Sequence, residues 1–345
     1  MIRRVTLLDL LAIDVPLVQA PMAGSNDSRL VIAVSEAGGL GSLPCATLTP
    51  DRIRVEVEAV RAGTDRPFNL NFLCHRSDPP GDAEGDRWLA RLAGYYAELG
   101  TEPPSSLASG RAPFDEELCA VVEELRPPVV SFHFGLPAEP LVDRVRATGA
   151  TVLSSATTVA EARWLVERGC GAVIAQGAEA GGHRGMFLTD APAGQVGTFA
   201  LVPQVVDAVD VPVIAAGGIG DGRGVAAALA LGAQGVQVGT AFLRTPEATT
   251  SEVHRRALAD ATDDATVLTN VLTGRPARGI VNRLVGEVGP LSDDAPAFPF
   301  ATAGVTPLRA AAEAHGSGDF SPLWAGQAAS LAREEPAADV VRRLV

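Results

Sequence analysis

The fold of this chain is decided by two glycine-ended segments, PVIAAGGIGDG at residues 212–222 and GVQVGTA at residues 235–241. Each begins as a short apolar strand and stops in glycines, and a helical pattern over residues 222–231 connects them. Two successive strand ends therefore offer bare backbone N–H groups and a helix N-terminus to one phosphate group. In a barrel of eight β/α units, the loops after the seventh and eighth strands form such a site.

Six further apolar runs of strand length precede these two, and helical patterns separate them. Strict alternation of strand and helix implies parallel strands that are covered on both faces. Eight units favour closure into a (β/α)8 TIM barrel over an open doubly wound sheet, because no G-x-G-x-x-G follows the first strand. The eight predicted strands cover residues 15–20, 40–43, 68–72, 129–132, 151–154, 172–175, 213–216 and 235–238.

Composition excludes several classes of protein. The chain has 345 residues, a length that accommodates one barrel with about a hundred residues of additions. A net charge of −13 and a pI near 4.9 argue against non-specific binding of nucleic acid or of an anionic membrane. Four cysteines without a C-x-x-C pair favour free thiols, and we therefore predict a cytoplasmic protein.

Two segments fall outside the β/α repeat. Residues 73–113 form an insertion after the third predicted strand, on the active-site face. The insertion is either a lid or side wall of the active site, or an interface or solvent-exposed loop. Residues 261–345 are predicted as loops and helices, including one at residues 321–331, that pack on the barrel. We therefore predict a barrel domain over residues 1–260, followed by this C-terminal helical extension.

Polar residues gather where the predicted strands end. The segments are QAPM at residues 19–22, NLNF at 69–72, SFHFG at 131–135 and GGHRG at 181–185. Side chains that follow buried barrel strands point into the mouth, where they contact a cofactor. One phosphate site, with amides and small residues around the mouth, suits flavin mononucleotide (FMN).

These motifs, together with AGGI at residues 216–219, QVGT at 237–240 and WAGQ at 324–327, resemble the nitronate monooxygenase (2-nitropropane dioxygenase-like) family of the bacterial class I type. The resemblance covers nearly the whole chain. It implies a TIM barrel that binds FMN and oxidises alkyl nitronates, such as propionate 3-nitronate, with dioxygen to a carbonyl product and nitrite. The implied partners are a small nitronate or nitroalkane and dioxygen, with no nucleic acid and no membrane, and the oligomeric state stays open.

The resemblance also assigns residues to the flavin. The residues that would lie near its ring are Met22, Asn71, Gln176 and Gly181. Those that would hold its ribityl phosphate are Gly218, Gln237, Val238, Gly239 and Thr240.

Two histidines are the catalytic candidates. His183 matches the family's active-site histidine, and its flanking glycines leave room for a flavin. It would act either as a base on a neutral nitroalkane or as the group that positions an anionic nitronate. His133 ends the fourth strand and either faces the same pocket or is a satisfied histidine at the barrel mouth. No H-x-x-x-H pair occurs, so we predict no metal.

Other interpretations stay open at this point. Arg184 either pairs with a substrate anion or is an exposed residue beside Glu179, and His254 and His315 are predicted on helix surfaces. A flavin-dependent reductase of the same superfamily, which uses NAD(P)H on an enoyl-acyl-carrier protein or a quinone, is the alternative function. A phosphate-binding isomerase or a non-catalytic ligand-binding barrel is the alternative from another class.

Overall fold

The computed structural model describes residues 5–76, 78–108 and 111–345, which include the predicted barrel. Its eight strands are hydrogen-bonded as one parallel sheet, in which a bridge between Val18 and Leu40 joins the first and last members. Across that junction, the N–H of Gln19 donates to the Leu40 carbonyl at 2.9 Å. All eight predicted strands are confirmed. Their bounds are β1 (Leu17–Gln19), β2 (Gly41–Pro44), β3 (Phe68–Leu73), β4 (Val129–His133), β5 (Thr151–Ala156), β6 (Ala172–Gln176), β8 (Val213–Ala216) and β9 (Gly235–Val238).

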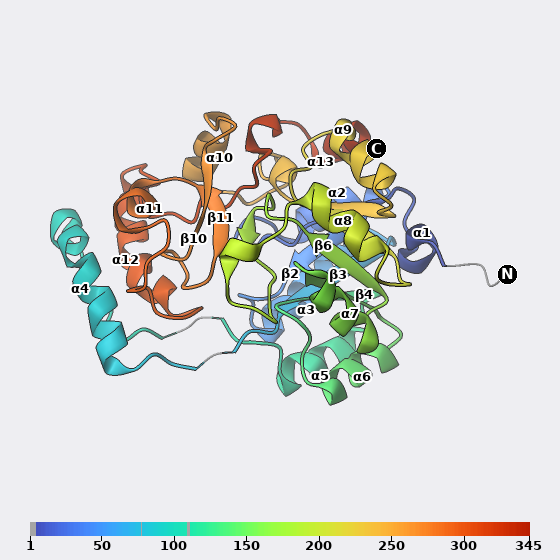
Figure 1. Ribbon diagram of the computed structural model, residues 1–345, viewed down its shortest axis with the longest axis horizontal. Helices are drawn as coiled ribbons and strands as arrows, with labels where there is room; N and C mark the ends of the chain where they lie inside the picture. The colour runs from blue at the N-terminus through green and yellow to red at the C-terminus, as the bar shows by residue number, and fades with distance from the viewer. Residues whose placement is uncertain (1–4, 77, 109–110) are drawn as a thin grey trace.

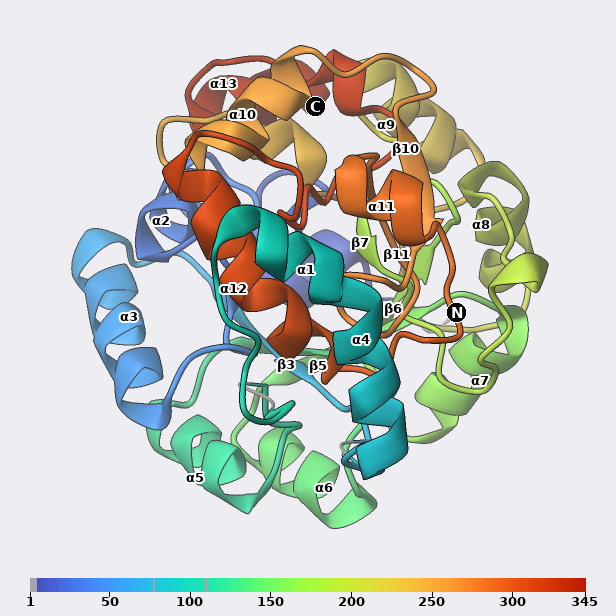
Figure 2. The ribbon, with the colours of Figure 1, turned by 90° about the vertical axis from the view of Figure 1, so that its left-hand side faces the viewer.

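Helices surround this barrel, as the ring in Figure 2 shows. Short polar side chains begin several of them: Thr49 accepts from the Arg52 N–H at 3.3 Å, and Thr158 accepts from the Glu161 N–H at 3.1 Å. The surrounding helices are α2 (Ser28–Glu36), α3 (Pro50–Gly63), α5 (Glu116–Leu125), α6 (Glu139–Ala147), α7 (Val159–Glu167), α8 (Thr198–Val206), α9 (Gly222–Ala230) and α10 (Glu252–Ala259).

Alternation along the strands separates two layers of the core. At each strand one residue packs toward the helices and its neighbour packs inside the barrel, as Val173 and Ile174 do in β6. The short helix α1 (Leu7–Leu11) belongs to the inner layer, since Leu7 and Leu11 cluster with Val18 and other inward residues. Helix α1 lies at the end of the molecule opposite α4 (Asp82–Leu99), so it covers the end of the barrel that faces away from α4 (Figure 1).

A second hydrophobic cluster covers the mouth. Helix α4, from the insertion, packs on α12 (Ala301–Ala314): the Trp88 indole donates to the Ala301 carbonyl at 3.1 Å, and Leu92 and Leu308 are buried in the same cluster. Helix α11 (Arg283–Val288) completes it. Figure 2 shows these three helices over the centre of the ring. We call residues 82–99 and 262–331 the roof.

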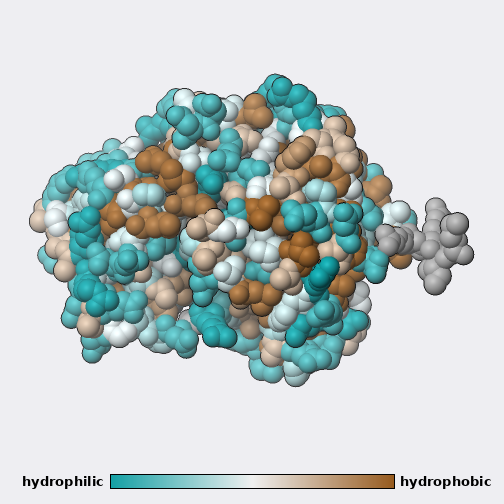
Figure 3. All heavy atoms as spheres, in the orientation of Figure 1, coloured by the Kyte–Doolittle hydropathy of each residue, from teal (hydrophilic) through white to brown (hydrophobic). Residues whose placement is uncertain are grey.

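The roof also contains a small antiparallel sheet that the sequence did not reveal. Strands β10 (Thr266–Thr269) and β11 (Ala277–Ile280) pair with each other, and β11 pairs with the two-residue strand β7 (Gly182–His183) from the loop after β6. Hydrophobic residues gather on the surface where Figure 1 draws β10, β11, α11 and α12 (Figure 3). The predicted helix at residues 321–331 is wrong, because only Ala329–Leu331 is helical there, as the 3-10 turn η3.

The last helix returns to the barrel. Helix α13 (Ala337–Leu344) buries Val340 and Val341 among the outer core residues, next to α2 and α9. A 3-10 turn, η1 (Pro192–Gly194), lies in the loop after β7. The division of the chain at residue 260 stays a prediction, and residues 77 and 109–110 of the insertion lie outside the described residues. Within the described ranges no helix is long and apolar enough to cross a membrane.

Candidate active site

One cavity at the carboxyl ends of the strands brings all the predicted site residues together. Three walls meet there: the strand ends, the loop that carries β7, and the roof segment from Trp324 to Ala328. The predicted residues that line the cavity are Met22, Asn71, His133, Gln176, Gly181, His183, Gly218, Gln237, Val238, Gly239 and Thr240.

The corner after β8 and β9 is built from backbone. Gly217 and Gly218 have φ of +112° and +71°, a left-handed region that favours glycine. The N–H groups of Gly218, Gly239 and Thr240 have no acceptor within the described residues, and Thr240 begins the 3-10 turn η2 (Thr240–Phe242). The N-terminus of α9 differs from the prediction, since the Asp221 carboxylate caps it by accepting from the Arg223 N–H at 3.0 Å. The open amides of this corner therefore belong to the loops and to η2.

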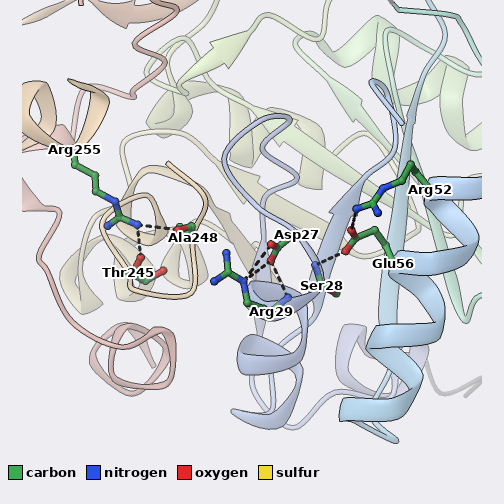
Figure 4. Close-up of polar contacts among 8 residues, drawn as sticks. All are labelled: Asp27, Ser28, Arg29, Arg52, Glu56, Thr245, Ala248 and Arg255. Carbon is green, nitrogen blue, oxygen red and sulfur yellow. Dashed lines mark hydrogen bonds and ion pairs between the residues drawn. The ribbon is translucent and has the colours of Figure 1, made fainter. Parts of the chain in front are cut away.

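Polar contacts fix the two loops beside this corner (Figure 4). The loop after β1 ends at Asp27, which caps α2, while Glu56 of α3 accepts from the Ser28 N–H at 3.0 Å. The loop after η2 is held by Arg255, whose guanidinium donates to the carbonyls of Thr245 and Ala248 at 2.8 and 2.9 Å. Both loops are therefore anchored from outside the cavity.

Met22, in the first of these loops, presents its side chain rather than its N–H to the cavity. The Met22 N–H donates to Asn26 Oδ1 at 2.9 Å, and the Asn26 amide in turn donates to the Ser42 carbonyl at 3.0 Å. Its thioether lies 3.5 Å from where a Cβ on Gly239 would stand. The Met22 N–H is therefore engaged within the loop and is not an open donor in the cavity.

The two amide side chains are oriented by neighbouring groups. Asn71 Nδ2 donates to the Ser131 hydroxyl at 2.9 Å, so its carbonyl oxygen is the group left for a ligand. Gln176 uses both ends of its amide: Nε2 donates to the His183 carbonyl at 3.0 Å, and Oε1 accepts from the Gly185 N–H at 2.7 Å. Gln176 thus holds the loop that carries His183.

His133 has both ring nitrogens engaged. Nε2 lies 3.1 Å from the His183 carbonyl, which can only accept, so Nε2 carries the hydrogen. Nδ1 then accepts from the Ser155 hydroxyl at 3.0 Å. Burial lowers the pKa of His133 to about 4, which keeps the ring neutral at neutral pH. The side chain has no nitrogen left to take a proton from a substrate.

His183 has one ring nitrogen engaged. Nε2 lies 2.9 Å from Thr273 Oγ1, and Nδ1 has no partner in the part of the chain that the structure describes. The rings of Phe298 and Trp324 flank the imidazole at centroid distances of 5.1 and 5.5 Å. Burial, followed by the nearby Arg111 guanidinium, holds the pKa of His183 well below its ordinary value. The imidazole is therefore neutral, with Nδ1 as the nitrogen available to a ligand.

The cavity is positive although the chain is acidic. Its described lining includes Arg111 and contains no aspartate or glutamate, whereas the whole chain carries a net charge of −13. A second guanidinium, that of Arg275, stacks on Phe134 with its carbon 4.1 Å from the ring centroid. Phe134 in turn lies 6.0 Å from the His183 ring. The site therefore attracts anions at short range.

Comparison with known proteins agrees with this geometry. The model of the family described as nitronate monooxygenase matches residues 4–345. The chain belongs to the nitronate monooxygenase family. It is 44% identical to a nitronate monooxygenase from Pseudomonas aeruginosa, over 97% of both chains.

Among solved structures, a nitroalkane oxidase from Streptomyces ansochromogenes is 42% identical with a TM-score of 0.90, and FabK from Thermotoga maritima is 29% identical with a TM-score of 0.72. These alignments cover 98% and 99% of this chain and 96% and 94% of the two structures. The chain is therefore an enzyme of this family, as the motifs predict.

Two expectations about individual side chains are wrong. His254 is buried rather than on a helix surface: it lines the cavity, and its Nε2 donates to the Trp324 carbonyl at 3.1 Å. Arg184 is fully buried rather than exposed, and its guanidinium donates to the carbonyls of Gln176 and Gly177 at 2.8 and 2.6 Å. Arg184 therefore closes the end of β6 and does not meet a substrate.

Gly181 lines the cavity, but its lack of a side chain serves the roof. A Cβ there would lie 2.6 Å from both the Ala325 carbonyl carbon and the Gly326 nitrogen. Gly326 donates its N–H to Thr240 Oγ1 at 3.0 Å, so the Thr240 side chain holds the roof while its backbone faces the cavity. The tight contact between Gly181 and Gly326 thus joins the loop after β6 to the roof.

The roof residues around His183 are not among those predicted from the sequence. Thr273, Phe298 and Arg275 lie in a stretch without helical or strand periodicity, about 90 or more residues from His183. The available signal was the cluster of threonine, glycine, arginine and proline at residues 273–276, which is typical of an ordered loop.

Proposed function

We propose that this enzyme binds FMN and oxidises alkyl nitronates with dioxygen to a carbonyl product and nitrite. The observation that carries the proposal is a cavity whose described lining holds no carboxylate side chain. It has open backbone amides at one corner, and the neutral His183 and the Arg111 guanidinium elsewhere in its lining. The open amides suit a phosphate, and His183 with the guanidinium suits a nitronate anion.

The residues present fit FMN. The open amides of Gly218, Gly239 and Thr240 are donors for a phosphate, and the chain lacks a second dinucleotide fingerprint. The carbonyl oxygen of Asn71 and the thioether of Met22 are placed for polar and apolar contact with the ring region. When bound, the flavin supplies the redox chemistry that moves electrons from the nitronate to dioxygen.

A pre-formed nitronate suits His183 better than a neutral nitroalkane does. A general base works best when its pKa lies near the operating pH, and burial depresses the pKa of His183 far below that. A neutral imidazole with Nδ1 facing the cavity can still donate a hydrogen bond to an oxyanion. We therefore assign His183 to orienting the nitronate, with Arg111 contributing positive charge.

The second catalytic candidate takes a supporting role in this proposal. Because both nitrogens of His133 are engaged and one of them donates to the His183 carbonyl, His133 positions the His183 loop. Gln176 donates to the same carbonyl and accepts from Gly185. Together they fix the backbone from which the His183 ring extends.

One anaerobic titration tests the proposal. The cofactor released from the purified protein is first identified by mass spectrometry, and we expect FMN. Propionate 3-nitronate, added without oxygen, should then change the flavin absorbance within minutes, whereas NADPH should not. Release of FAD, or a flavin that does not respond to the nitronate, would contradict the proposal.

A reductase that uses NAD(P)H is the second candidate, because the chain is also similar to FabK. Rapid bleaching of the flavin by NADPH in the same titration, with no response to the nitronate, would establish this alternative. The four free cysteines support our further proposal of a reducing, cytoplasmic location.

A further inference from the structure

Thr273 of the roof makes the one side-chain hydrogen bond of His183 within the described residues. Its Oγ1 lies 2.9 Å from His183 Nε2 and 3.4 Å from the Arg275 carbonyl. The residue is 2% exposed, so solvent does not replace either contact. A hydroxyl both donates and accepts, whereas a carbonyl only accepts. Thr273 is therefore able to bond either tautomer of His183.

The turn that carries Thr273 is rigidly placed. The N–H groups of Thr273 and Gly274 donate to the Asn270 carbonyl at 3.2 and 2.7 Å. Gly274 has a φ of +90°, and a Cβ there would lie 2.1 Å from the Pro296 carbonyl oxygen. The turn therefore packs directly against the segment that leads to Phe298, and Phe298 flanks the His183 imidazole. Thr273 is held in place independently of His183.

In the free site, one arrangement satisfies more hydrogen bonds than the other. If Thr273 donates to the Arg275 carbonyl, its oxygen accepts from His183 Nε2–H, and both contacts are made. If Thr273 donates to Nε2 instead, the contact with the Arg275 carbonyl is lost. The first arrangement leaves Nδ1 as a bare acceptor in the cavity, which would repel a nitronate oxygen.

An anion in the cavity reverses this preference. A hydrogen bond from Nδ1–H to an oxyanion is charge-assisted and about twice as strong as a neutral one. The contact given up, between Thr273 and the Arg275 carbonyl, is long at 3.4 Å and correspondingly weak. The hydroxyl therefore turns to donate to Nε2 when the anion binds.

We infer that Thr273 is a positioning residue whose hydroxyl sets the tautomer of His183: it accepts from Nε2–H in the free enzyme and donates to Nε2 when a nitronate is bound. This inference rests on the proposed function for the identity of the anion. The protein thereby presents a hydrogen-bond donor to the substrate without forming an imidazolium in a buried, positive cavity.

Nitrogen NMR of the ring tests the inference without turnover. The flavin-loaded protein is labelled with ¹⁵N-histidine, and the His183 signals are assigned from their loss in His183→Asn. Sodium nitrate, a planar oxyanion that the enzyme does not oxidise, serves as the probe. We expect Nδ1 unprotonated without nitrate and protonated at saturation, with Nε2 changing in the opposite sense.

Two matched variants complete the test. Thr273→Val keeps the shape but removes the hydroxyl, and it should weaken nitrate binding about tenfold and abolish the tautomer switch. Thr273→Ser keeps the hydroxyl and should stay within about twofold of the wild type in both measurements. Wild-type behaviour of Thr273→Val, an unchanged His183 tautomer in saturating nitrate, or no nitrate binding would each overturn the inference. If the switch occurs in an enzyme that does not consume oxygen with any nitronate, the proposed function fails and the role of Thr273 stands.

Discussion

The barrel and the roof contribute to the cavity in different ways. On the barrel side, two side chains near His183 are fully engaged: Gln176 uses both ends of its amide and His133 uses both ring nitrogens. The roof supplies Thr273, which engages one nitrogen of His183 and leaves the other to the cavity. The roof also supplies the aromatic flanks of that ring, Phe298 and Trp324.

A side chain that only holds neighbouring groups differs from one that can also bind a ligand. A side chain with every donor and acceptor satisfied is rigid but has nothing left to offer a ligand. His133 and His183 are both partly buried histidines with lowered pKa values, yet of the two only His183 keeps a nitrogen without a partner in the described residues. The histidine to which we assign the nitronate therefore lies where the barrel and the roof meet, and the following changes test that division.

The largest expected effect is on the two histidines. His183→Asn should lower turnover of nitronates by roughly 10²-fold, since the group that orients the anion is lost. His133→Asn should cost about tenfold, through the His183 loop alone. Oxygen uptake at saturating and limiting nitronate measures both. Loss of activity on neutral nitroalkanes alone in His183→Asn would show that His183 is a base, and a larger loss in His133→Asn would reverse the assignment.

The contact between barrel and roof is tested at two adjacent glycines. Gly181→Ala places a methyl group 2.6 Å from roof backbone atoms, and it should cost about 1–3 kcal/mol of stability and weaken flavin retention. Gly182→Ala is the matched control, because its φ is +73° but nothing lies within 4 Å of the added Cβ. We expect the control to lose stability without losing flavin, as measured by urea unfolding and the flavin-to-protein ratio. Equal flavin loss in both variants would mean that the close approach to the roof is unimportant.

The positive charge in the lining gives a smaller effect. Arg111→Gln should raise the KM for propionate 3-nitronate about tenfold and leave kcat within about twofold, because the charge acts on binding. Arg309→Gln is the control: Arg309 is paired with Glu313 at 2.8 Å and is absent from the described lining of the cavity. A kcat effect without a KM effect at Arg111 would argue against anion attraction.

The smallest expected effect is a change in the free energy of unfolding with pH. Burial lowers the pKa of His133 and His254 to about 4, below the ordinary value near 6.5. The unfolded chain therefore binds these protons first as the pH falls. The stability that the neutral rings contribute is complete above about pH 6.5 and is lost as the pH falls toward 4. Urea midpoints between pH 4.5 and 7 should rise with pH, and His254→Gln should reduce the slope by about one proton. A flat profile would show that these rings are not buried as neutral groups.

Sequence patterns were sufficient for the barrel and for the residues that line its mouth. Strands such as β6 and β8 are short apolar runs that end in polar or glycine residues, and parallel strands place those ends together. Patterns were insufficient where burial depends on distant segments. His254 was expected at the surface, and Arg184 either at the surface or paired with a substrate anion, but both are buried and donate to backbone carbonyls. The segment at residues 321–331 has helix-forming residues, yet its bridge to Gly279 and its contacts with Gly181 keep residues 321–328 out of a helix.

The sequence by itself determined the closed barrel, the glycine corner and the place of His183 in the loop after β6. Each of these follows from interactions between residues that are near in the chain: alternating burial along a strand, and a turn that only glycine adopts freely. The tertiary structure alone decided which nitrogen of His183 is free and what surrounds the ring. Those features depend on Thr273 and Phe298, about 90 and more residues away, whose approach is set by packing of the roof rather than by any local pattern.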